Sequence, residues 1–187
     1  MHYRDALMWN GRNNYVRAFV GLGSNLGDRA AYLLLGVRGM MDAGLGVCRL
    51  SAIYETDPVG VVGQPPFLNL VAELHVRNFT AKQVLARLLR VEYGAGRRRD
   101  GRTGPRTLDL DLLFFGDQLH DTELLKVPHP RLHERRFVLT PLFDLEPSLR
   151  HPILDRTITD LLINLSDDAA VKRWKPAGHA KPKQAGV

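Results

Sequence analysis

The 187-residue sequence predicts a single α+β domain that has a mostly antiparallel sheet with helices on both faces. The length suits one domain with a substantial core, and neither an internal repeat nor an interdomain linker interrupts it. Apolar residues alternate along some segments, as in strands, and recur with helical spacing along others. In chain order these segments run strand, helix, strand, strand, helix, strand, followed by further helical stretches.

The first half of the chain supplies three strands and a helix. Residues 16–23, VRAFVGLG, form the first expected strand, and apolar residues at helical spacing predict a helix over residues 28–43. Residues 47–54 and 67–76 are the next expected strands. In the second of these, apolar residues at even positions alternate with a more polar set at odd positions, so the two sets face opposite sides of the sheet.

The second half supplies another strand and three helices. Thr80 is a suitable N-cap for a helix over residues 81–93. An arginine-rich loop, a strand that carries two aspartates and a turn at Gly116-Asp117 follow, before helical patterns over residues 131–145 and 157–165. Because strand–helix–strand–strand–helix–strand is the split βαβ order, the expected core is ferredoxin-like.

The positive charge of the chain is confined to two segments. The formal net charge is +6, but residues 97–106 contribute five arginines and one aspartate, and residues 171–187 contribute five lysines or arginines and no acid. The two segments carry +9 together, so the rest of the chain sums to −3. Such local charge favours a small anionic ligand over a surface that coats nucleic acid, and we expect no nucleic-acid partner.

The ends of the chain and its single cysteine suggest one domain between polar segments. We expect a polar N-terminal extension over residues 1–16, a catalytic domain over 17–166 and a disordered basic tail over 167–187. No apolar run approaches the ~20 residues of a membrane span, so we expect no membrane partner. Cys48 is the only cysteine, which excludes an internal disulfide and favours a cytoplasmic protein. Its place in an alternating strand predicts a buried structural thiol.

Two aspartates interrupt an otherwise apolar strand in the segment TLDLDLLFF, residues 107–115. Strict alternation gives one face with Thr107, Asp109, Asp111, Leu113 and Phe115 and another with Leu108, Leu110, Leu112 and Phe114. Two carboxylates so close together in apolar surroundings need positive charge between them. Alone, the pair would equally suit an edge strand with one face in solvent.

The segment directly upstream supplies that positive charge. Five arginines lie in residues 97–106, on a stretch with glycines at positions 94, 96 and 101. Carboxylates that bind Mg²⁺ beside mobile arginines that bind phosphate are the two halves of a phosphoryl-transfer site. The metal would neutralise and align the phosphate oxygens, and the arginines would meet the charge that develops on the transferring group.

A loop rich in proline and glycine, residues 54–69, ends on Phe67 and Asn69, which share one strand face. An aromatic ring beside an amide suits a flat heterocycle with a hydrogen-bonding edge. A loop end that is simply packed would have the same composition, so this segment alone leaves both interpretations open.

Other motifs indicate less. GLGSNLGDR, residues 21–29, lacks the spacing of a dinucleotide fingerprint and is explained by a tight turn between a strand and a helix. No P-loop motif occurs. His129 and His133 flank Pro130 without an evident third ligand, which disfavours a zinc site.

Several motifs in register resemble those of one family. GPRTLDLDLLFFG, together with FVGLGSNLGDR, YETDPVG, QPPFLN, GRRR and VPHPRL, resembles 6-hydroxymethyl-7,8-dihydropterin pyrophosphokinases of folate synthesis, from about Arg17 to Pro147. The resemblance implies an α+β fold on a ferredoxin-like core. It also implies that pyrophosphate passes from MgATP to the hydroxymethyl oxygen of the pterin, with release of AMP.

The resemblance further implies roles for individual residues. Asp109 and Asp111 match aspartates that bind two Mg²⁺ ions, and Arg97 and Arg106 match loop arginines that assist transfer. The pterin pocket is matched by Thr56, Pro58, Val59, Phe67, Asn69 and Phe137, with the two phenylalanines placed to sandwich the ring. Nucleotide-side positions are matched by Glu92, Arg99, Arg102, Leu112, His129 and Arg135. One position departs, because many members have tryptophan before GPR, where Thr103 stands here.

Two other functions are weighed against this one. A nucleotidyltransferase also uses two strand aspartates and a Gly-Ser pair, but there the pair precedes the aspartates closely, whereas Gly23-Ser24 and Asp109 are far apart here. A non-catalytic RNA-binding module would need aromatic residues among the basic ones, and the basic loop has none. The expected partners are therefore ATP and the pterin, bound by a monomer.

Overall fold

The computed structural model describes residues 15–58, 63–98, 104–167 and 169–176. Within them, six strands form one antiparallel sheet in the order β10-β3-β4-β1-β5, and β2 also pairs with β4. The strands of this sheet are β1 Val16–Ser24, β2 Gly46–Leu50, β3 Tyr54–Thr56, β4 Phe67–Val76, β5 Asp109–Phe115 and β10 Val171–Arg173. The order confirms the ferredoxin-like core, since β5, β1, β4 and the β2–β3 pair occupy its four strand positions.

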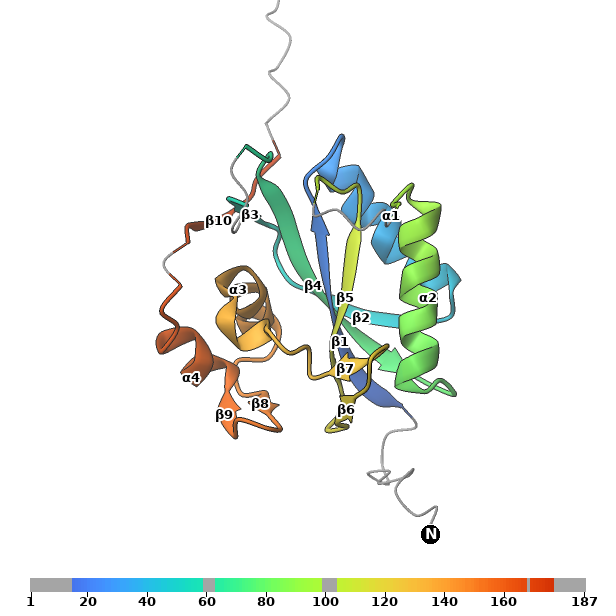
Figure 1. Ribbon diagram of the computed structural model, residues 1–187, viewed down its shortest axis with the longest axis vertical. Coiled ribbons are helices and arrows are strands. Elements are labelled where there is room, and N and C mark those ends of the chain that lie inside the picture. The colour runs from blue at the N-terminus through green and yellow to red at the C-terminus, as the bar shows by residue number, and fades with distance from the viewer. Residues whose placement is uncertain (1–14, 59–62, 99–103, 168, 177–187) are drawn as a thin grey trace, which may run out of the picture.

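Helices cover both faces of the sheet, as predicted (Figure 1). Helices α1 Arg29–Asp42 and α2 Ala81–Gly94 pack on one face, and α3 Arg136–Leu145 packs on the other beside α4 Ile158–Ile163. The remaining elements are β6 His120–Asp121, β7 Lys126–Val127, a 3₁₀ turn η1 Leu132–Glu134, β8 Arg150–His151 and β9 Arg156–Thr157. Among the described residues, no helix is both long enough and apolar enough to cross a bilayer.

Each face of the sheet has its own apolar core. The even positions of β4 pack under α1 and α2, while Phe19, Val71 and Leu139 belong to the core under α3. The helices begin where the sequence predicts, because Asp28 caps α1 and Thr80 forms a capping box with Gln83 at α2. The alternation of β4 therefore separates two cores cleanly.

The single strand expected over residues 47–54 is two strands. Between β2 and β3, the N–H of Val71 in β4 donates to the Ser51 hydroxyl at 2.9 Å, and the N–H of Ala52 donates to Asp144. The Ser51 N–H still donates to the Val71 carbonyl at 2.9 Å. The other two N–H groups have side-chain acceptors, so regular pairing with β4 stops between β2 and β3. The buried thiol predicted at Cys48 is also wrong: Cys48 is exposed, because it lies where the register shifts between Val47 and Arg49.

Strict alternation in β5 also fails, at its C-terminal end. Val20 of β1 pairs with Leu112 but Phe19 pairs with Phe114, so Leu113 is an extra residue opposite β1. Leu113 and Phe114 consequently both lie in the core under α3, and Phe115 lies in the core under α1 and α2. The faces predicted for Phe114 and Phe115 are therefore exchanged, whereas Asp109 and Asp111 precede the bulge and share a face as predicted.

Two further expectations change near the C-terminus. The helix expected over residues 131–145 is divided into η1 and α3, because Arg135 between them has extended backbone angles (φ −122°, ψ 105°). The disorder expected over residues 167–187 is wrong for β10, which pairs with β3. The last helix, α4, lies within the predicted range 157–165 and is capped by Thr157.

Candidate active site

A cleft of about 510 Å³ lies between the sheet and the start of α3. Of the residues singled out in the sequence, it is lined by Thr56, Pro58, Phe67, Asn69, Arg106, Asp109, Asp111, Arg135 and Phe137. These side chains come from β3, β4, β5 and the first turn of α3, and from the loops next to them. Fold topology thus gathers residues that are up to about eighty positions apart in the sequence.

The floor of the cleft is formed by glycines of the central strand β1. Gly23 lies between Asn69 on β4 and Asp109 on β5, and Gly21 lies between Val71 and Asp111. A Cβ atom at Gly23 would come within 3.2 Å of the Asn69 amide oxygen and within 3.9 Å of the Asp109 Cβ. Because Gly21 and Gly23 have no side chains, the cleft has an open floor here. This floor lies between the aromatic and amide side of the cleft and the carboxylates. Sequence reasoning saw only a tight turn here.

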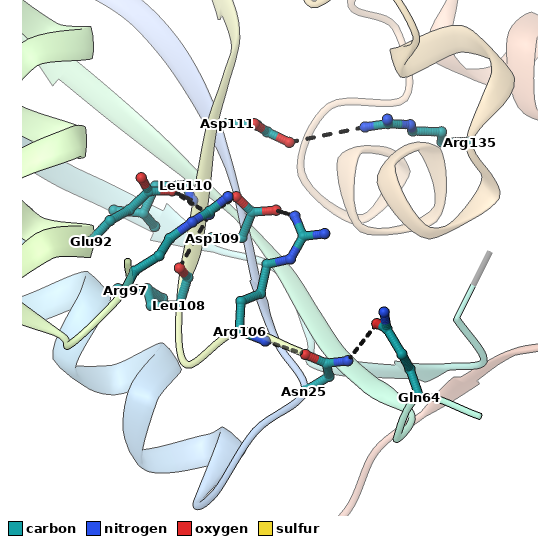
Figure 2. Close-up of polar contacts among 10 residues, drawn as sticks. All are labelled: Asn25, Gln64, Glu92, Arg97, Arg106, Leu108, Asp109, Leu110, Asp111 and Arg135. Carbon is teal, nitrogen blue, oxygen red and sulfur yellow. Dashed lines mark hydrogen bonds and ion pairs between the residues drawn. The ribbon is translucent and has the colours of Figure 1, made fainter. Parts of the chain in front are cut away.

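Asp109 is fully engaged by two arginines (Figure 2). The guanidinium of Arg97 pairs with one carboxylate oxygen, and Arg106 donates to the other at 2.6 Å. Burial acts to raise the pKa of Asp109, but the charges and hydrogen bonds of the two arginines outweigh it and hold the pKa below its ordinary value. The carboxylate is therefore an anion that arginines already neutralise.

Asp111 is much less well compensated. Among the described residues, its ion-pair partner is Arg135, at 4.0 Å between nitrogen and oxygen (Figure 2). The Asp111 side chain remains 41% exposed. Surrounding protein and then the charge of Asp109 raise the pKa of Asp111 to about 6, although Arg135 opposes both effects. The cleft thus contains a carboxylate that a further cation would stabilise.

Glu92 supports the cluster from behind the strand. This carboxylate is 2% exposed, and it accepts hydrogen bonds from the Leu110 N–H at 2.8 Å and from Arg97 at 2.7 Å. Arg97 also donates to the Leu108 carbonyl. Glu92 therefore fixes α2 to β5 and orients Arg97 toward Asp109, and neither Glu92 nor Arg97 lines the cleft itself.

The opposite side of the cleft is aromatic and amide in character. The Asn69 amide donates to the Thr56 hydroxyl at 2.8 Å, which fixes the amide plane on the buried side of the cleft. The Arg106 guanidinium lies 5.8 Å from the centre of the Phe67 ring, and Arg135 lies 5.6 Å from that of Phe137. Each aromatic ring thus has a cation beside it, between the ring and the carboxylates.

Asn25 is a site residue that sequence reasoning missed. Its amide oxygen accepts the Arg106 N–H at 2.7 Å, and its own N–H donates to the Arg106 carbonyl at 3.1 Å. The amide nitrogen donates to Gln64 at 3.2 Å (Figure 2). It also donates to the Pro65 carbonyl. Asn25 therefore joins the end of the arginine loop to the segment that leads into Phe67. In the sequence, the available indication was the asparagine in GLGSNLGDR, and the structure shows that this side chain is buried.

Besides Glu92, two further nucleotide-side expectations lie outside the cleft. The Leu112 side chain packs in the core under α1 and α2, so only its backbone could take part in binding. Burial and then the charge of Arg135 lower the pKa of His129 to about 4, and its Nδ1 accepts the N–H of Arg131. The imidazole is therefore neutral at pH 7. The expectations for Val59, Arg99, Arg102 and Thr103 fall outside the described residues.

The donor set suits a metal that arrives with phosphate. The described residues contain no group of three or more His, Cys, Asp and Glu side chains that could hold an ion unaided. Asp109 and Asp111 supply carboxylate oxygens on one strand face, and Mg²⁺ commonly combines one or two carboxylates with substrate phosphates and water. The residues present therefore fit Mg²⁺ bound together with a nucleotide.

Known proteins share this fold and these motifs. The Bacillus subtilis 2-amino-4-hydroxy-6-hydroxymethyldihydropteridine pyrophosphokinase is 44% identical over 129 residues, which cover 68% of this chain and 77% of that protein. A folate synthesis bifunctional protein of Arabidopsis thaliana is 44% identical over 132 residues, but these cover 70% of this chain and only 27% of the plant protein.

A solved structure agrees in fold. Plasmodium falciparum HPPK-DHPS with pterin and p-hydroxybenzoate superposes with a TM-score of 0.63 at 18% identity, covering 82% of this chain and 43% of that one. A family model for 7,8-dihydro-6-hydroxymethylpterin-pyrophosphokinase (HPPK) matches residues 19–147, which include the aspartate pair, its arginines and both phenylalanines of the cleft. The chain belongs to the HPPK family.

Proposed function

We propose that this chain transfers the pyrophosphoryl group of ATP to the hydroxymethyl group of 6-hydroxymethyl-7,8-dihydropterin, a step of tetrahydrofolate biosynthesis. The observation that carries the proposal is the cleft itself, in a member of the HPPK family. A carboxylate pair with arginines stands on one side of a glycine floor, and two phenylalanines and an asparagine stand on the other. That division suits a phosphate chain and a flat heterocycle that react across the floor.

The pterin binds on the aromatic side in this proposal. Phe67 and Phe137 hold the faces of the ring, and Asn69 meets its polar edge with the amide that Thr56 orients. Pro58 and Val59 complete the pocket. The hydroxymethyl group then points along the sheet toward Asp109 and Asp111.

ATP binds on the carboxylate side. Its phosphate oxygens compete with Asp109 for Arg97 and Arg106, so that the two guanidinium groups move from a carboxylate to the phosphates. Arg99, Arg102, His129 and Arg135 contact the nucleotide, and Glu92 and Leu112 support that side from the strand and helix behind it. Asp109 and Asp111 would hold two Mg²⁺ ions, which supply charge neutralisation and alignment of the phosphate oxygens.

The reaction is a displacement at the β-phosphorus. The hydroxymethyl oxygen forms a bond to that phosphorus while the bond to the oxygen shared with the α-phosphate breaks. AMP leaves, and the hydroxyl proton is released to water. Arg97 and Arg106 stabilise the negative charge spread over the moving diphosphate, which is why their effect is expected mainly on kcat. In this proposal both reactants lie across one strand, so their orientation would supply much of the rate.

Further proposals concern the protein as a whole. The catalytic domain extends from residue 17 through β10, beyond the end expected at residue 166, because β10 belongs to the sheet. The protein acts as a monomer in the cytoplasm, and neither nucleic acid nor membrane takes part. The uneven charge of the sequence supports a small anionic partner. Gel filtration with light scattering tests the monomer directly.

Product analysis tests the reaction. Chromatography of a mixture of enzyme, MgATP and the dihydropterin should give AMP and a pterin diphosphate in equal amounts, and neither without Mg²⁺. ADP as the nucleotide product would indicate an ordinary kinase. Free pyrophosphate with an adenylated pterin would indicate a nucleotidyltransferase, and either result would refute the proposal.

A further inference from the structure

A segment beyond the family match borders the cleft through Asp167. We define the C-terminal strap as residues 165–167 and 169–174, whereas the family model ends at residue 147. At one end, Leu165 packs against the core under α3. At the other end, β10 pairs with β3. The backbone N–H of Trp174 donates to the Ile53 carbonyl, and Trp174 packs against the core under α1 and α2. The strap is therefore anchored in both cores.

Between these anchors, Asp167 reaches the first turn of α3. Its carboxylate accepts the Arg136 N–H at 3.0 Å, and its carbonyl accepts the Arg136 Nε–H at 2.6 Å. The other carboxylate oxygen accepts the Ala169 N–H at 2.9 Å. Asp167 thus acts as a helix cap supplied from 31 residues away, while the local N-cap residue, Arg135, makes no side-chain capping bond.

The turn that Asp167 holds is the one that carries site residues. Arg135, Phe137 and Val138 line the cleft, and Asp167 lines it beside them. Because Arg135 is extended and Arg136 begins the helix, the N–H of Arg136 is the first one that helix geometry leaves without an internal acceptor. A partner for this group fixes where α3 begins, and hence where the Phe137 ring stands over the floor.

We propose that Asp167 is a positioning residue for the pterin side of the cleft. It holds the first turn of α3 in register with β3, because the same strap that carries Asp167 pairs with the strand that carries Thr56. The two pterin-binding walls, Phe137 on α3 and the Thr56–Asn69 pair on the sheet, are thereby tied together at their open end. The inference rests on the proposed pterin site.

A matched pair of aspartates tests this role in the full-length chain. Asp160 also caps a helix, since its carboxylate accepts the N–H and hydroxyl of Thr157 at α4, but it does not line the cleft. Asp167→Ala should weaken binding of 6-hydroxymethylpterin about fivefold to tenfold, measured by fluorescence with Mg²⁺ and α,β-methylene-ATP present. Asp160→Ala should lower the melting temperature about as much as Asp167→Ala does, but it should leave the pterin affinity unchanged.

Two further readouts separate positioning from mere stability. Hydrogen exchange of residues 136–139 should accelerate in Asp167→Ala and not in Asp160→Ala, and Asp167→Asn, which keeps one acceptor oxygen, should recover part of the affinity. Equal pterin affinity in wild type and Asp167→Ala, or equal weakening in both alanine variants, would overturn the proposal. If Asp167→Ala does not fold, Asp167→Asn and Asp160→Asn give the same comparison. If the wild-type chain binds no pterin, this result would instead refute the proposed function.

Discussion

Two clusters of charged residues lie on the same face of the sheet and differ in how completely they are paired. Outside the cleft, the distal cluster joins Arg17, Arg49, Glu73 and Glu146. Glu73 is 3% exposed and receives Arg17 at 2.8 Å and Arg49 at 2.5 Å, and Arg17 also pairs with Glu146 at 2.8 Å. In the cleft cluster, Asp109 is equally well paired, but among the described residues Asp111 has an ion pair with Arg135 alone, at 4.0 Å.

The pKa values of Glu73 and Asp111 differ in the same sense. Burial acts to raise the pKa of Glu73, but Arg17 and Arg49 outweigh it and lower the pKa below 4.5. Burial and the neighbouring Asp109 raise the pKa of Asp111 to about 6. A structural cluster compensates each of its carboxylates within the chain. The cleft cluster leaves one carboxylate for a cation that comes with the substrate.

Removal of the undercompensated carboxylate should have the largest effect on catalysis. Asp111→Asn is expected to lower kcat for AMP formation by about a thousandfold or more, because the phosphates lose the cation partner that Asp111 holds. Its melting temperature should equal that of wild type or exceed it, since a poorly compensated charge has gone. Product chromatography and calorimetry measure the two quantities. A kcat close to that of wild type would show that catalysis does not depend on the Asp111 carboxylate.

The arginines of the cleft cluster should come next. Arg97→Ala and Arg106→Ala are expected to lower kcat about a hundredfold each and to weaken ATP binding less, because their charge is needed most in the transition state. Arg98→Ala is the matched control, since Arg98 lies over the Tyr93 ring and donates to backbone carbonyls instead of Asp109. Equal losses in all three variants would mean that only the net charge of the loop counts.

The aromatic wall should show a smaller and more selective effect. Phe67→Ala is expected to weaken pterin binding about tenfold through loss of a stacking face, with little change in ATP binding. Phe143→Ala removes a ring from the exposed side of α3 and should change neither affinity. Isothermal titration with each ligand distinguishes these outcomes, and comparable losses for both ligands would indicate general damage to the fold.

The distal cluster should have the smallest effect on catalysis. Glu73→Gln is expected to reduce the free energy of unfolding by about 2 kcal/mol near neutral pH and to leave kcat unchanged. Because the folded pKa of Glu73 lies below its unfolded value, its stabilisation is present above about pH 4.5 and is lost as the pH falls through the folded pKa. The difference in the free energy of unfolding between wild type and Glu73→Gln should therefore become smaller in acid. Urea unfolding at several pH values measures this difference. A gap that is independent of pH would exclude an ionic origin.

Local patterns were sufficient to predict most of the fold. The apolar spacing of α1 and the capping box at Thr80 placed two helices almost to the residue, and the alternation of β4 placed its side chains in the correct cores. Some errors occur at register shifts between strands, as at Cys48 and at Phe114 and Phe115. Others occur where a side chain accepts a hydrogen bond from the backbone. Ser51 and Asp144 accept backbone hydrogen bonds between β2 and β3, and Asp167 accepts one at the start of α3. The sequence around these positions gives no indication of such side-chain acceptors.

The candidate site shows the same limit. Alternation placed Asp109 and Asp111 on one face, and the same reasoning put Phe67 beside Asn69, because these relations are local to one strand. The pairing of Gly23 with both Asn69 and Asp109 depends on sheet register, which the spacing of a single strand does not contain. The same holds for Asn25, whose partners are 39 and 81 residues away. The bulge at Leu113 likewise exists only relative to β1.

The glycine floor has a consequence for inhibitors that lie across it. A flat compound pressed against Gly21 and Gly23 contacts main-chain atoms, which every substitution retains. Resistance through these positions could arise only by the addition of a side chain, and at Gly23 the first added carbon already meets the Asn69 amide oxygen at 3.2 Å. Such a change would obstruct the natural heterocycle as well as the drug. Compounds that take their affinity from this part of the cleft should therefore select resistance at its rim instead, among the side chains of the loops.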